Sequence, residues 1–303
     1  CCYTEGKFNV ARFAPAAPTR GRMQDTIIKA VEKMPAFPKS VHQVITLTSD
    51  INCSQKQLVE VIKNDPVFTL KILKLVNSPF FGLMKEVTSI NQASVYLGLN
   101  TLKNVALGLA AIGCLPGKNK AGFDMGAFWL HSLAVASATK LLGQQLGASR
   151  DEAGDFFAAG LLHDVGKVVL ALHAPEEFKR ALDLAAEGRA LHQAEQEALG
   201  LDHAEVGGLL ARHWNLPGRL TQAIRSHHAA APGDDSLCQC VWAANQVAKR
   251  AGHGQAGDGR VEALPEAVAG RLGGGVDDLV ARLDGLPAEV ERARSFIQVG
   301  GAA

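Results

Sequence analysis

The stretch Leu161-Leu162-His163-Asp164-Val165-Gly166-Lys167 lies at the centre of the pattern that decides the fold of this chain. It continues a strongly apolar run, residues 156–162, which predicts a buried helix. That helix would deliver an adjacent histidine and aspartate at its end. Because an aspartate among so many apolar residues needs a compensating charge, the stretch predicts a cation site inside a helical core.

Length and composition limit what such a site can serve. The chain has 303 residues, of which 47% are hydrophobic, enough for one large or two ordinary globular domains. It has 31 basic and 30 acidic residues, and no run of Lys or Arg is longer than a pair. The charge pattern of a nucleic-acid-binding protein is therefore missing, and we expect no direct contact with nucleic acid.

The same composition also argues against a membrane-spanning protein and against a small disulfide-rich fold. The longest uncharged stretches, 104–117 and 125–139, are shorter than the roughly 20 apolar residues that span a bilayer, so we expect no transmembrane helix. Six cysteines in so long a chain do not form a disulfide framework, and Cys238 and Cys240 are expected to be core thiols. A cytoplasmic location fits this usage. Residues 1–20 show no signal-peptide pattern, and we expect them to be disordered or foreign to the domain.

Helical periodicity runs through the chain, and no segment alternates with period two over any length. The sequence therefore predicts an all-α fold. Residues 21–116 are expected to form a smaller N-terminal helical subdomain, followed by a linker at 115–122 and a larger helical subdomain over 123–251. Residues 252–303 are expected to contain a flexible glycine-rich surface loop, 252–260, and C-terminal helices. The helices predicted beyond the linker span about 125–146, 150–162, 174–186, 191–198, 203–214, 217–227, 237–250, 265–272 and 276–299.

Several polar residues can be matched to the His163-Asp164 pair. His131 lies in an apolar helix and, taken alone, is better explained as a hydrogen-bonded core histidine. His203 begins one predicted helix, and His227-His228 closes another, so these imidazoles can point inward. Asn245 is a polar residue on an otherwise apolar helix face.

These residues and the motifs before them carry a resemblance to a known family. The order of His131, His163-Asp164 with Gly166-Lys167, His203, His227-His228 and Asn245 resembles the HD superfamily of metal-dependent phosphohydrolases. The front half narrows the resemblance to the HDOD family, the HD-related output domain of bacterial signalling proteins. Its matching motifs are Met34-Pro35-Ala36-Phe37-Pro38, Ile62-Lys63-Asn64-Asp65-Pro66, Val76-Asn77-Ser78-Pro79-Phe80-Phe81-Gly82 and Ile90-Asn91-Gln92-Ala93 through Leu97-Gly98.

The resemblance implies an HD-like multi-helix bundle with a metal centre. The implied ligand set for one or two divalent ions is His131, His163, Asp164, His203, His227, His228 and Asn245. Asp164 could bridge two ions, and Lys167 could either reach a phosphate or be a solvated lysine after a helix end. So many imidazoles would suit Fe, Mn, Zn or Ni better than Mg or Ca. The alternative is a metal-free network in which the histidines bond to one another and to Asp164.

Two departures from the enzymatic pattern direct the functional hypotheses. The last ligand of HD enzymes is an aspartate, whereas this chain has Asn245, whose neutral carbonyl binds divalent ions more weakly. The related cyclic di-GMP phosphodiesterases carry a Gly-Tyr-Pro segment after their histidine pair, whereas here the chain continues Ala229-Ala230-Ala231-Pro232. We therefore favour a non-catalytic bacterial signal-transduction module that contacts other signalling proteins. A metal-dependent phosphohydrolase acting on a nucleotide or cyclic dinucleotide is the first alternative, and a regulator that binds a nucleotide without cleaving it is the second.

Overall fold

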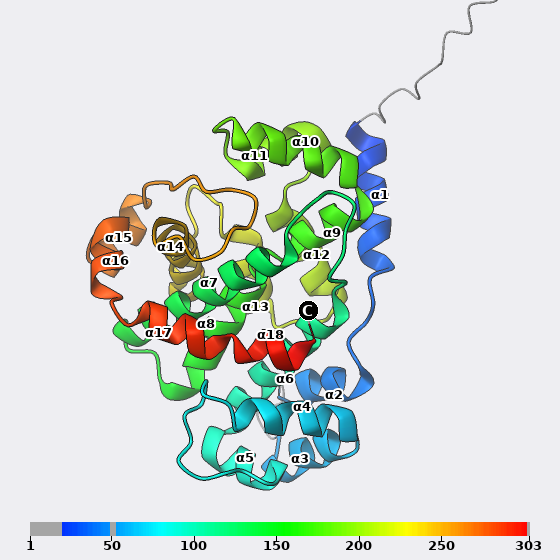
Figure 1. Cartoon of the computed structure of the whole chain (residues 1–303), viewed down its shortest axis with the longest axis vertical. Coiled ribbons are helices and arrows are strands. Elements are labelled where there is room, and N and C mark those ends of the chain that lie inside the picture. Colours follow the sequence, from blue (N-terminus) through cyan, green and yellow to red (C-terminus); the bar gives the residue numbers. More distant parts are fainter. Residues whose placement is uncertain (1–19, 49–52, 302–303) are drawn as a thin grey trace, which may run out of the picture.

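The computed structural model describes residues 20–48 and 53–301, and over this part of the chain every regular element is a helix (Figure 1). The prediction of an all-α fold is confirmed. The expectation for residues 1–20 falls almost wholly on 1–19, which lie outside the described residues. In chain order the helices are α1 (Arg20–Glu32), α2 (Lys39–Thr48), α3 (Gln55–Lys63), α4 (Pro66–Val76), α5 (Ile90–Leu97), α6 (Leu99–Cys114), α7 (Met125–Gln145), α8 (Arg150–Leu162), α9 (Val165–His173), α10 (Pro175–Ala186), α11 (Leu191–Leu199), α12 (His203–His213), α13 (Gly218–Ser226), α14 (Ser236–Arg250), α15 (Glu266–Leu272), α16 (Val276–Arg282), α17 (Leu286–Ala293) and α18 (Ser295–Gly300).

Local sequence sets most helix boundaries. Asp65 caps α4 by accepting a hydrogen bond from the backbone N–H of Phe68, and Pro66 occupies the first turn, where its missing N–H is not needed. Ser149 and Glu152 form a reciprocal capping box at the start of α8. The helix that carries the central histidine and aspartate is therefore fixed at its first turn by its own sequence.

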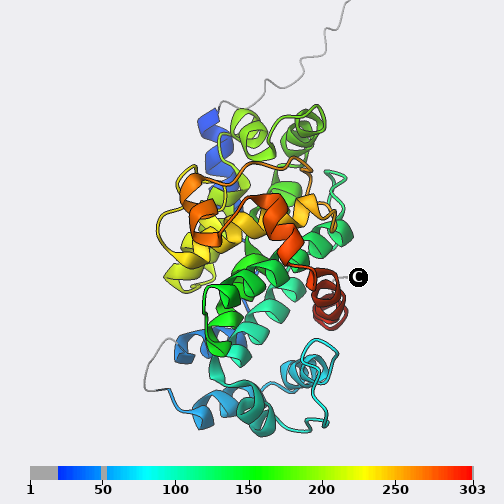
Figure 2. The same ribbon diagram turned by 90° about the vertical axis from the view of Figure 1, so that its left-hand side faces the viewer.

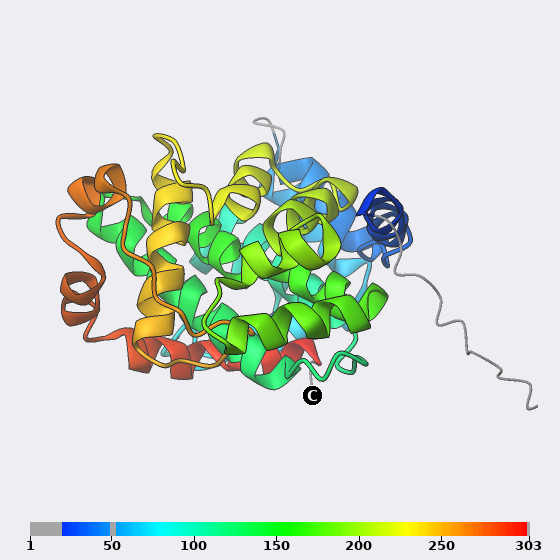
Figure 3. The ribbon, with the colours of Figure 1, turned by 90° about the horizontal axis from the view of Figure 1, so that it is seen from above.

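The helices form a small lobe and a larger bundle. Helices α2 to α5 make up the small lobe at the bottom of Figures 1 and 2, and α6 joins it to the bundle by packing against both α2 and α8. Helix α14 lies between α16 and the remaining helices of the bundle (Figure 3). The C-terminal helices run across the junction, since α17 packs on α7 while α18 packs on α6 and α4.

Helix α1 belongs spatially to the bundle, because it packs against α9, α11 and α12. The segment after it is held in place by the end of α12. Phe37 stacks on Trp214 with ring centroids 4.4 Å apart, and Trp214 Nε1 donates a hydrogen bond of 3.0 Å to the carbonyl of Pro35. The motif at residues 34–38, which precedes the small lobe, thus anchors the start of that lobe to the larger bundle.

The structure corrects the sequence-based picture at three places. A separate helix, α9, begins at Val165, directly after the histidine and aspartate, where we predicted none. The single helix predicted over 276–299 is wrong, because a new helix begins at Leu286 with Pro287 in its first turn and the chain turns again at Arg294, giving α16, α17 and α18. The glycine-rich loop over 252–260 is irregular as expected, yet it packs against α7 through a hydrogen bond from the Gln255 N–H to the Ala127 carbonyl.

The apolar stretch at the centre of the bundle is long enough to raise the question of a membrane span. Residues Glu152–His173, which cover most of α8 and all of α9, pass a length and hydropathy test for such a span, and 89% of the apolar window is buried inside the protein. The bent pair of α5 and α6 passes only if its two helices count as one span. Burial of this kind is what the core helix of a bundle shows.

Candidate metal centre

The fold brings all of the predicted ligand residues to one place. His131 lies in the middle of α7, His163 and Asp164 lie between α8 and α9, and His203 is the first residue of α12. His227 and His228 follow α13, and Asn245 lies in α14. All of them are buried except His228, which is half-buried. Five separate segments of the chain therefore converge on a site in the interior of the bundle.

Asp164 divides the site into two groups of ligand atoms. Its Oδ1 lies 3.1 Å from His203 Nε2 and 3.3 Å from His227 Nε2. Its Oδ2 lies 3.2 Å from His163 Nε2 and 3.9 Å from His131 Nε2. Within each group, one formed by Asp164 with His203, His227 and His228 and the other by Asp164 with His131 and His163, the ligand atoms lie within 4.8 Å of one another. The carboxylate is placed to bridge two cation positions.

Hydrogen bonds to the outer nitrogens orient the imidazoles. Nδ1 of His163 donates to the carbonyl of Gly160 over 2.7 Å, and Nδ1 of His227 donates to the carbonyl of Ile224 over 2.6 Å. Because a carbonyl can only accept, the proton of each neutral ring is on Nδ1, and the lone pair of Nε2 points into the site. This is the arrangement that holds histidine ligands around metal ions in proteins.

Glu195 on α11 completes the surroundings of His203 and was missed by the sequence analysis. Its Oε2 lies 2.5 Å from His203 Nδ1 and accepts a hydrogen bond of 2.9 Å from the His203 backbone N–H. Glu195 is fully buried and shares the inner face of α11 with Leu191, Ala194 and Leu199. A glutamate at an apolar position of a predicted helix is the signal that could have identified it.

The charges around the site act in opposite directions on its histidines. Burial lowers the pKa of His131 and of His227 to about 3, in spite of the nearby Asp164 carboxylate. Burial also opposes protonation of His203, but the carboxylates of Glu195 and Asp164 outweigh it and raise the pKa of His203 to about 9. Without a metal ion, His203 thus carries a second proton at neutral pH.

Lys167 is not the solvated lysine that one of our two sequence readings described. It lies inside α9, it is 1% exposed, and its Nζ donates a hydrogen bond of 2.6 Å to Asp164 Oδ2. Burial disfavours the charged form of Asp164, but the neighbouring His163 and Lys167 hold its pKa well below the usual value. An ammonium group therefore takes up part of the charge of the carboxylate on the side facing His131 and His163.

Asn245 is used as a hydrogen-bond partner of His131. Its Oδ1 lies 3.1 Å from His131 Nε2, and its Nδ2 makes no hydrogen bond although it is buried. Because the amide oxygen is an acceptor, this contact requires a proton on Nε2 of His131. In this arrangement the Nε2 atom of His131 is a donor to Asn245 and has no lone pair for a cation.

The loop after α14 closes the site on the side of His131. Lys249 Nζ and Asp258 Oδ2 form a buried ion pair at 3.1 Å, and Gly254 lies so close to α7 that a Cβ there would overlap the backbone of His131 and Ala127. A cavity of about 500 Å³ remains between His131, Lys249 and this loop. Its one lysine is already paired with Asp258.

The donor set of the first group fits a transition-metal ion. His203 Nε2 lies 3.2 Å from His227 Nε2 and 3.0 Å from His228 Nε2, so three ring nitrogens face one another at close range. His163 Nε2 is buried and makes no hydrogen bond, and the buried Asp164 Oδ1 lies 3.1 Å from His203 Nε2. Lone pairs gathered in this way repel one another unless a proton or a cation lies among them. Imidazole nitrogens with one carboxylate suit Fe, Mn, Zn or Ni, and the same atoms can be held together by the proton on His203.

Comparison with known proteins places the fold. The profile of the HDOD domain matches residues 34–230, more than half of the chain. A protein of unknown function from Treponema pallidum (strain Nichols) is 28% identical over 210 residues, which are 68% of this chain and 40% of that relative. This chain therefore spans less than half the length of that relative.

Two solved structures share the arrangement of helices. The HDOD domain protein of unknown function from Geobacter sulfurreducens is 25% identical with a TM-score of 0.70, and the match covers 90% of this chain and 98% of that one. A protein from Shewanella amazonensis SB2B, provisionally described as a phosphohydrolase, is 24% identical with a TM-score of 0.69 and coverage of 89% and 98%. The resemblance inferred from the motifs is confirmed by these matches: this chain belongs to the HDOD family.

Proposed function

We propose that this chain is a regulatory module of bacterial signal transduction that acts through contacts with other signalling proteins and does not turn over substrate. The observation that carries the proposal is the contact between Asn245 and His131. In place of the last carboxylate ligand of the HD pattern, Asn245 uses its amide oxygen as a hydrogen-bond partner of His131 Nε2 at 3.1 Å. The side of the site facing His131 thus loses one negative charge and one imidazole lone pair.

Lys167 weakens the same side further. Its ammonium group, 2.6 Å from Asp164 Oδ2, already supplies a positive charge to the oxygen that a second ion would need. Hydrolysis of a phosphate ester by two ions depends on both positions, because one ion activates the water while the other stabilises the leaving oxygen. Because the Lys167 ammonium group already balances the charge of Asp164 where a second ion would bind, the site is better suited to hold one ion, or one proton, that links the helices.

Access to the site supports the same conclusion. His163, Asp164, His203 and His227 are at most 1% exposed, and the loop with the Lys249–Asp258 pair covers the flank of His131. A phosphate that is to be attacked must come within about 3 Å of the attacking oxygen. Asp164 is fully buried, so such an approach would require the side chains around it to move.

The test is a direct assay of turnover. Protein loaded with Mn²⁺ or Fe²⁺ should show no hydrolysis of cyclic di-GMP or of nucleoside phosphates above the rate of a His163→Ala variant. Hydrolysis at ordinary enzymatic rates that His163→Ala abolishes would overturn the proposal. Calorimetry with the same compounds separates a module that binds a nucleotide from one that does not.

A metal-dependent phosphohydrolase remains the alternative because Asp164 bridges two groups of ligand atoms. In that case His131, His163, Asp164, His203 and His227 or His228 would hold the ions, and Lys167 would contact a substrate phosphate. The alternative predicts stoichiometric metal in the purified protein and turnover that Asp164→Ala abolishes. Metal-free protein whose thermal stability does not rise with added Mn²⁺ or Zn²⁺ would exclude it.

A further inference from the structure

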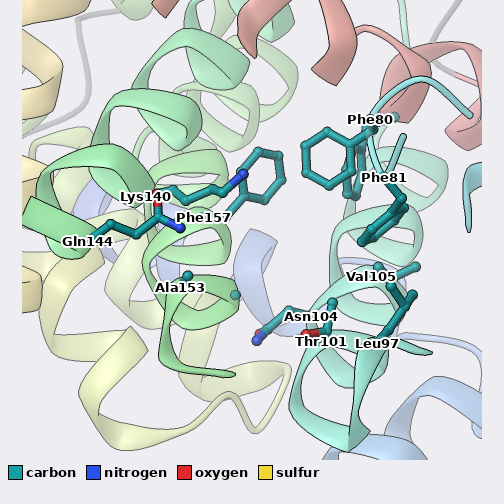
Figure 4. A pocket seen from close by; sticks show the side chains of 12 residues that line it. Phe80, Phe81, Leu97, Thr101, Asn104, Val105, Lys140, Gln144, Ala153 and Phe157 are labelled. Atoms are coloured by element: carbon teal, nitrogen blue, oxygen red, sulfur yellow. The ribbon is translucent and has the colours of Figure 1, made fainter. Parts of the chain in front are cut away.

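A second pocket, remote from the histidine cluster, opens where the small lobe meets the bundle (Figure 4). It has a volume of about 210 Å³ and is lined by residues of the loop before α5 and of α5, α6, α7, α8 and α18. Gln144 at its edge is exposed, so the pocket reaches the surface. None of its lining residues belongs to the metal centre.

The inner wall of the pocket is aromatic. Phe80 lies with its ring centroid 5.1 Å from that of Phe157 and 4.9 Å from that of Phe296. Phe81 lies edge-on to Phe80 at 4.8 Å, and both rings pack against the core while remaining only partly buried. Four rings from three distant segments of the chain thus line the pocket, Phe157 and Phe296 buried and Phe80 and Phe81 partly exposed.

Two polar side chains in the wall of this apolar pocket could fix the orientation of a bound ligand. The ammonium group of Lys140 lies 5.5 Å from the centre of the Phe80 ring, and Figure 4 shows the side chain reaching toward the phenylalanines. Its partner Glu289, at 3.4 Å, also pairs with Arg292, so this edge carries one net positive charge. On another wall, Asn104 donates a hydrogen bond of 2.9 Å from Nδ2 to Asp155, which leaves its side-chain oxygen able to accept one.

We infer that this pocket binds a small aromatic carboxylate. A cavity of about 150 Å³ lined by apolar side chains is large enough to bind benzene, so 210 Å³ accommodates a ring with a short side chain. The phenylalanine rings offer edges and faces to an aromatic ligand, Lys140 offers a cation to its carboxylate, and Asn104 offers an acceptor to a ring N–H. Ligand sites at lobe junctions have this composition, with an apolar lining and few polar groups.

Two helices, α7 and α8, connect the pocket to the histidine cluster. Ala153, Gly154 and Phe157 line it from α8, and His163 directly follows this helix, about 9 Å along its axis from Phe157. Lys140 lines it from α7, which also carries His131. The role of such a ligand as the signal that the module receives rests on the proposed function, whereas its binding does not.

The experiment is isothermal titration calorimetry of the full chain, without added metal, using indole-3-acetate and its neutral analogue 3-methylindole. The wild-type protein should bind both at millimolar concentration or below, the carboxylate more tightly. Lys140→Gln should weaken indole-3-acetate about twofold to fivefold and leave 3-methylindole unchanged, because a partly exposed ion pair is worth up to about 1 kcal/mol. Lys140→Arg should retain the preference, and Lys179→Gln on the exposed face of α10 should change nothing.

Ala153→Phe, which fills the pocket, should abolish binding of both compounds. If that variant does not fold, fluorine NMR of wild-type protein labelled with fluorophenylalanine answers the same question. The ligand should shift the resonances of Phe80, Phe81, Phe157 and Phe296. Single Phe→Leu substitutions assign these resonances. Absence of binding to the wild type, or binding that leaves these four resonances unmoved, would overturn the inference and leave the proposed function standing. Turnover by metal-loaded protein would overturn the proposed function and leave the binding result intact.

Discussion

Lys167 Nζ lies 2.6 Å from Asp164 Oδ2, and both side chains are at most 1% exposed. The pair is separated by one turn across the start of α9, so the carboxylate that would bridge two ions also neutralises a buried lysine. Removing either partner would leave the other charge buried without compensation, which in proteins costs far more than breaking a surface ion pair.

Asp164→Asn is accordingly expected to lower the free energy of unfolding of the metal-free protein by about 3–5 kcal/mol, measured by urea denaturation. Asp277→Asn is the matched control, because Asp277 pairs with Arg250 at the surface, where both side chains are more than half exposed. Its effect should stay below about 1 kcal/mol. Equal effects of the two substitutions would mean that Lys167 is not charged in the folded protein.

Gly166 sets the distance between α9 and α12. A Cβ at this position would overlap the carbonyl oxygen of His203 and lie 2.6 Å from the backbone nitrogen of Gly207. Gly166→Ala should therefore push α12 away from α9, destabilise the protein by about 3 kcal/mol or more and weaken any metal binding that uses His203.

Gly270→Ala is the control for that substitution. Gly270 lies within α15, and a Cβ there would meet nothing within 4 Å. Because alanine is the better helix former, the variant should be more stable by roughly 0.5–1 kcal/mol, measured in the same denaturation experiment. Loss of stability in both variants would show that the close approach of α9 and α12 is not the cause.

The contrast between these glycines shows what the sequence could and could not predict. The apolar run predicted α8 with its observed bounds, and the histidines that the family resemblance grouped together do lie close to one another, four of them buried. The pattern could not show that α9 follows α8 almost at once. Asp164 stands just before α9 but makes no capping hydrogen bond with its side chain, so no local signal marks the start of this helix. For the same reason the sequence could not show that Lys167 is buried beside Asp164, and it missed Glu195, which contacts His203 from α11.

Stability should vary with pH in a way that reports the proton on His203. The folded-state pKa of His203 is about 9, above its ordinary value of 6.5. Its contribution to stability is therefore fully present below pH 6.5 and is lost as the pH rises through 9, a loss of roughly 3 kcal/mol in metal-free protein. Denaturation curves recorded from pH 6.5 to 9.5 measure it.

Glu195→Gln should remove most of that decline, because Glu195 is the principal charge that raises the pKa of His203. A bound metal ion should remove it as well, since the Nε2 atom that ligates a cation carries no proton. The same substitution should weaken metal binding about 10–100-fold, the usual effect of losing a carboxylate behind a histidine ligand. A decline that persists unchanged in Glu195→Gln would place the titrating group elsewhere.

Asn245→Asp tests whether the missing carboxylate alone separates this protein from a hydrolase. The new charge would lie beside His131 Nε2, to which the Asn245 Oδ1 atom is 3.1 Å away, and would add an anionic ligand on the side of Asp164 that faces Lys167. At an effective dielectric constant of 20, a charge about 4 Å from another interacts with on the order of 4 kcal/mol, which leaves a gain of at least about tenfold in Mn²⁺ affinity after desolvation. Competition with a chelator measures this gain, and Asn91→Asp on the exposed face of α5 should show none.

We expect no hydrolysis of cyclic di-GMP by Asn245→Asp, because Lys167 still neutralises Asp164 and the loop with the Lys249–Asp258 pair still covers the flank of His131. Turnover in this variant would show instead that one amide had silenced a complete enzyme, and that neither the lysine nor the loop blocks catalysis.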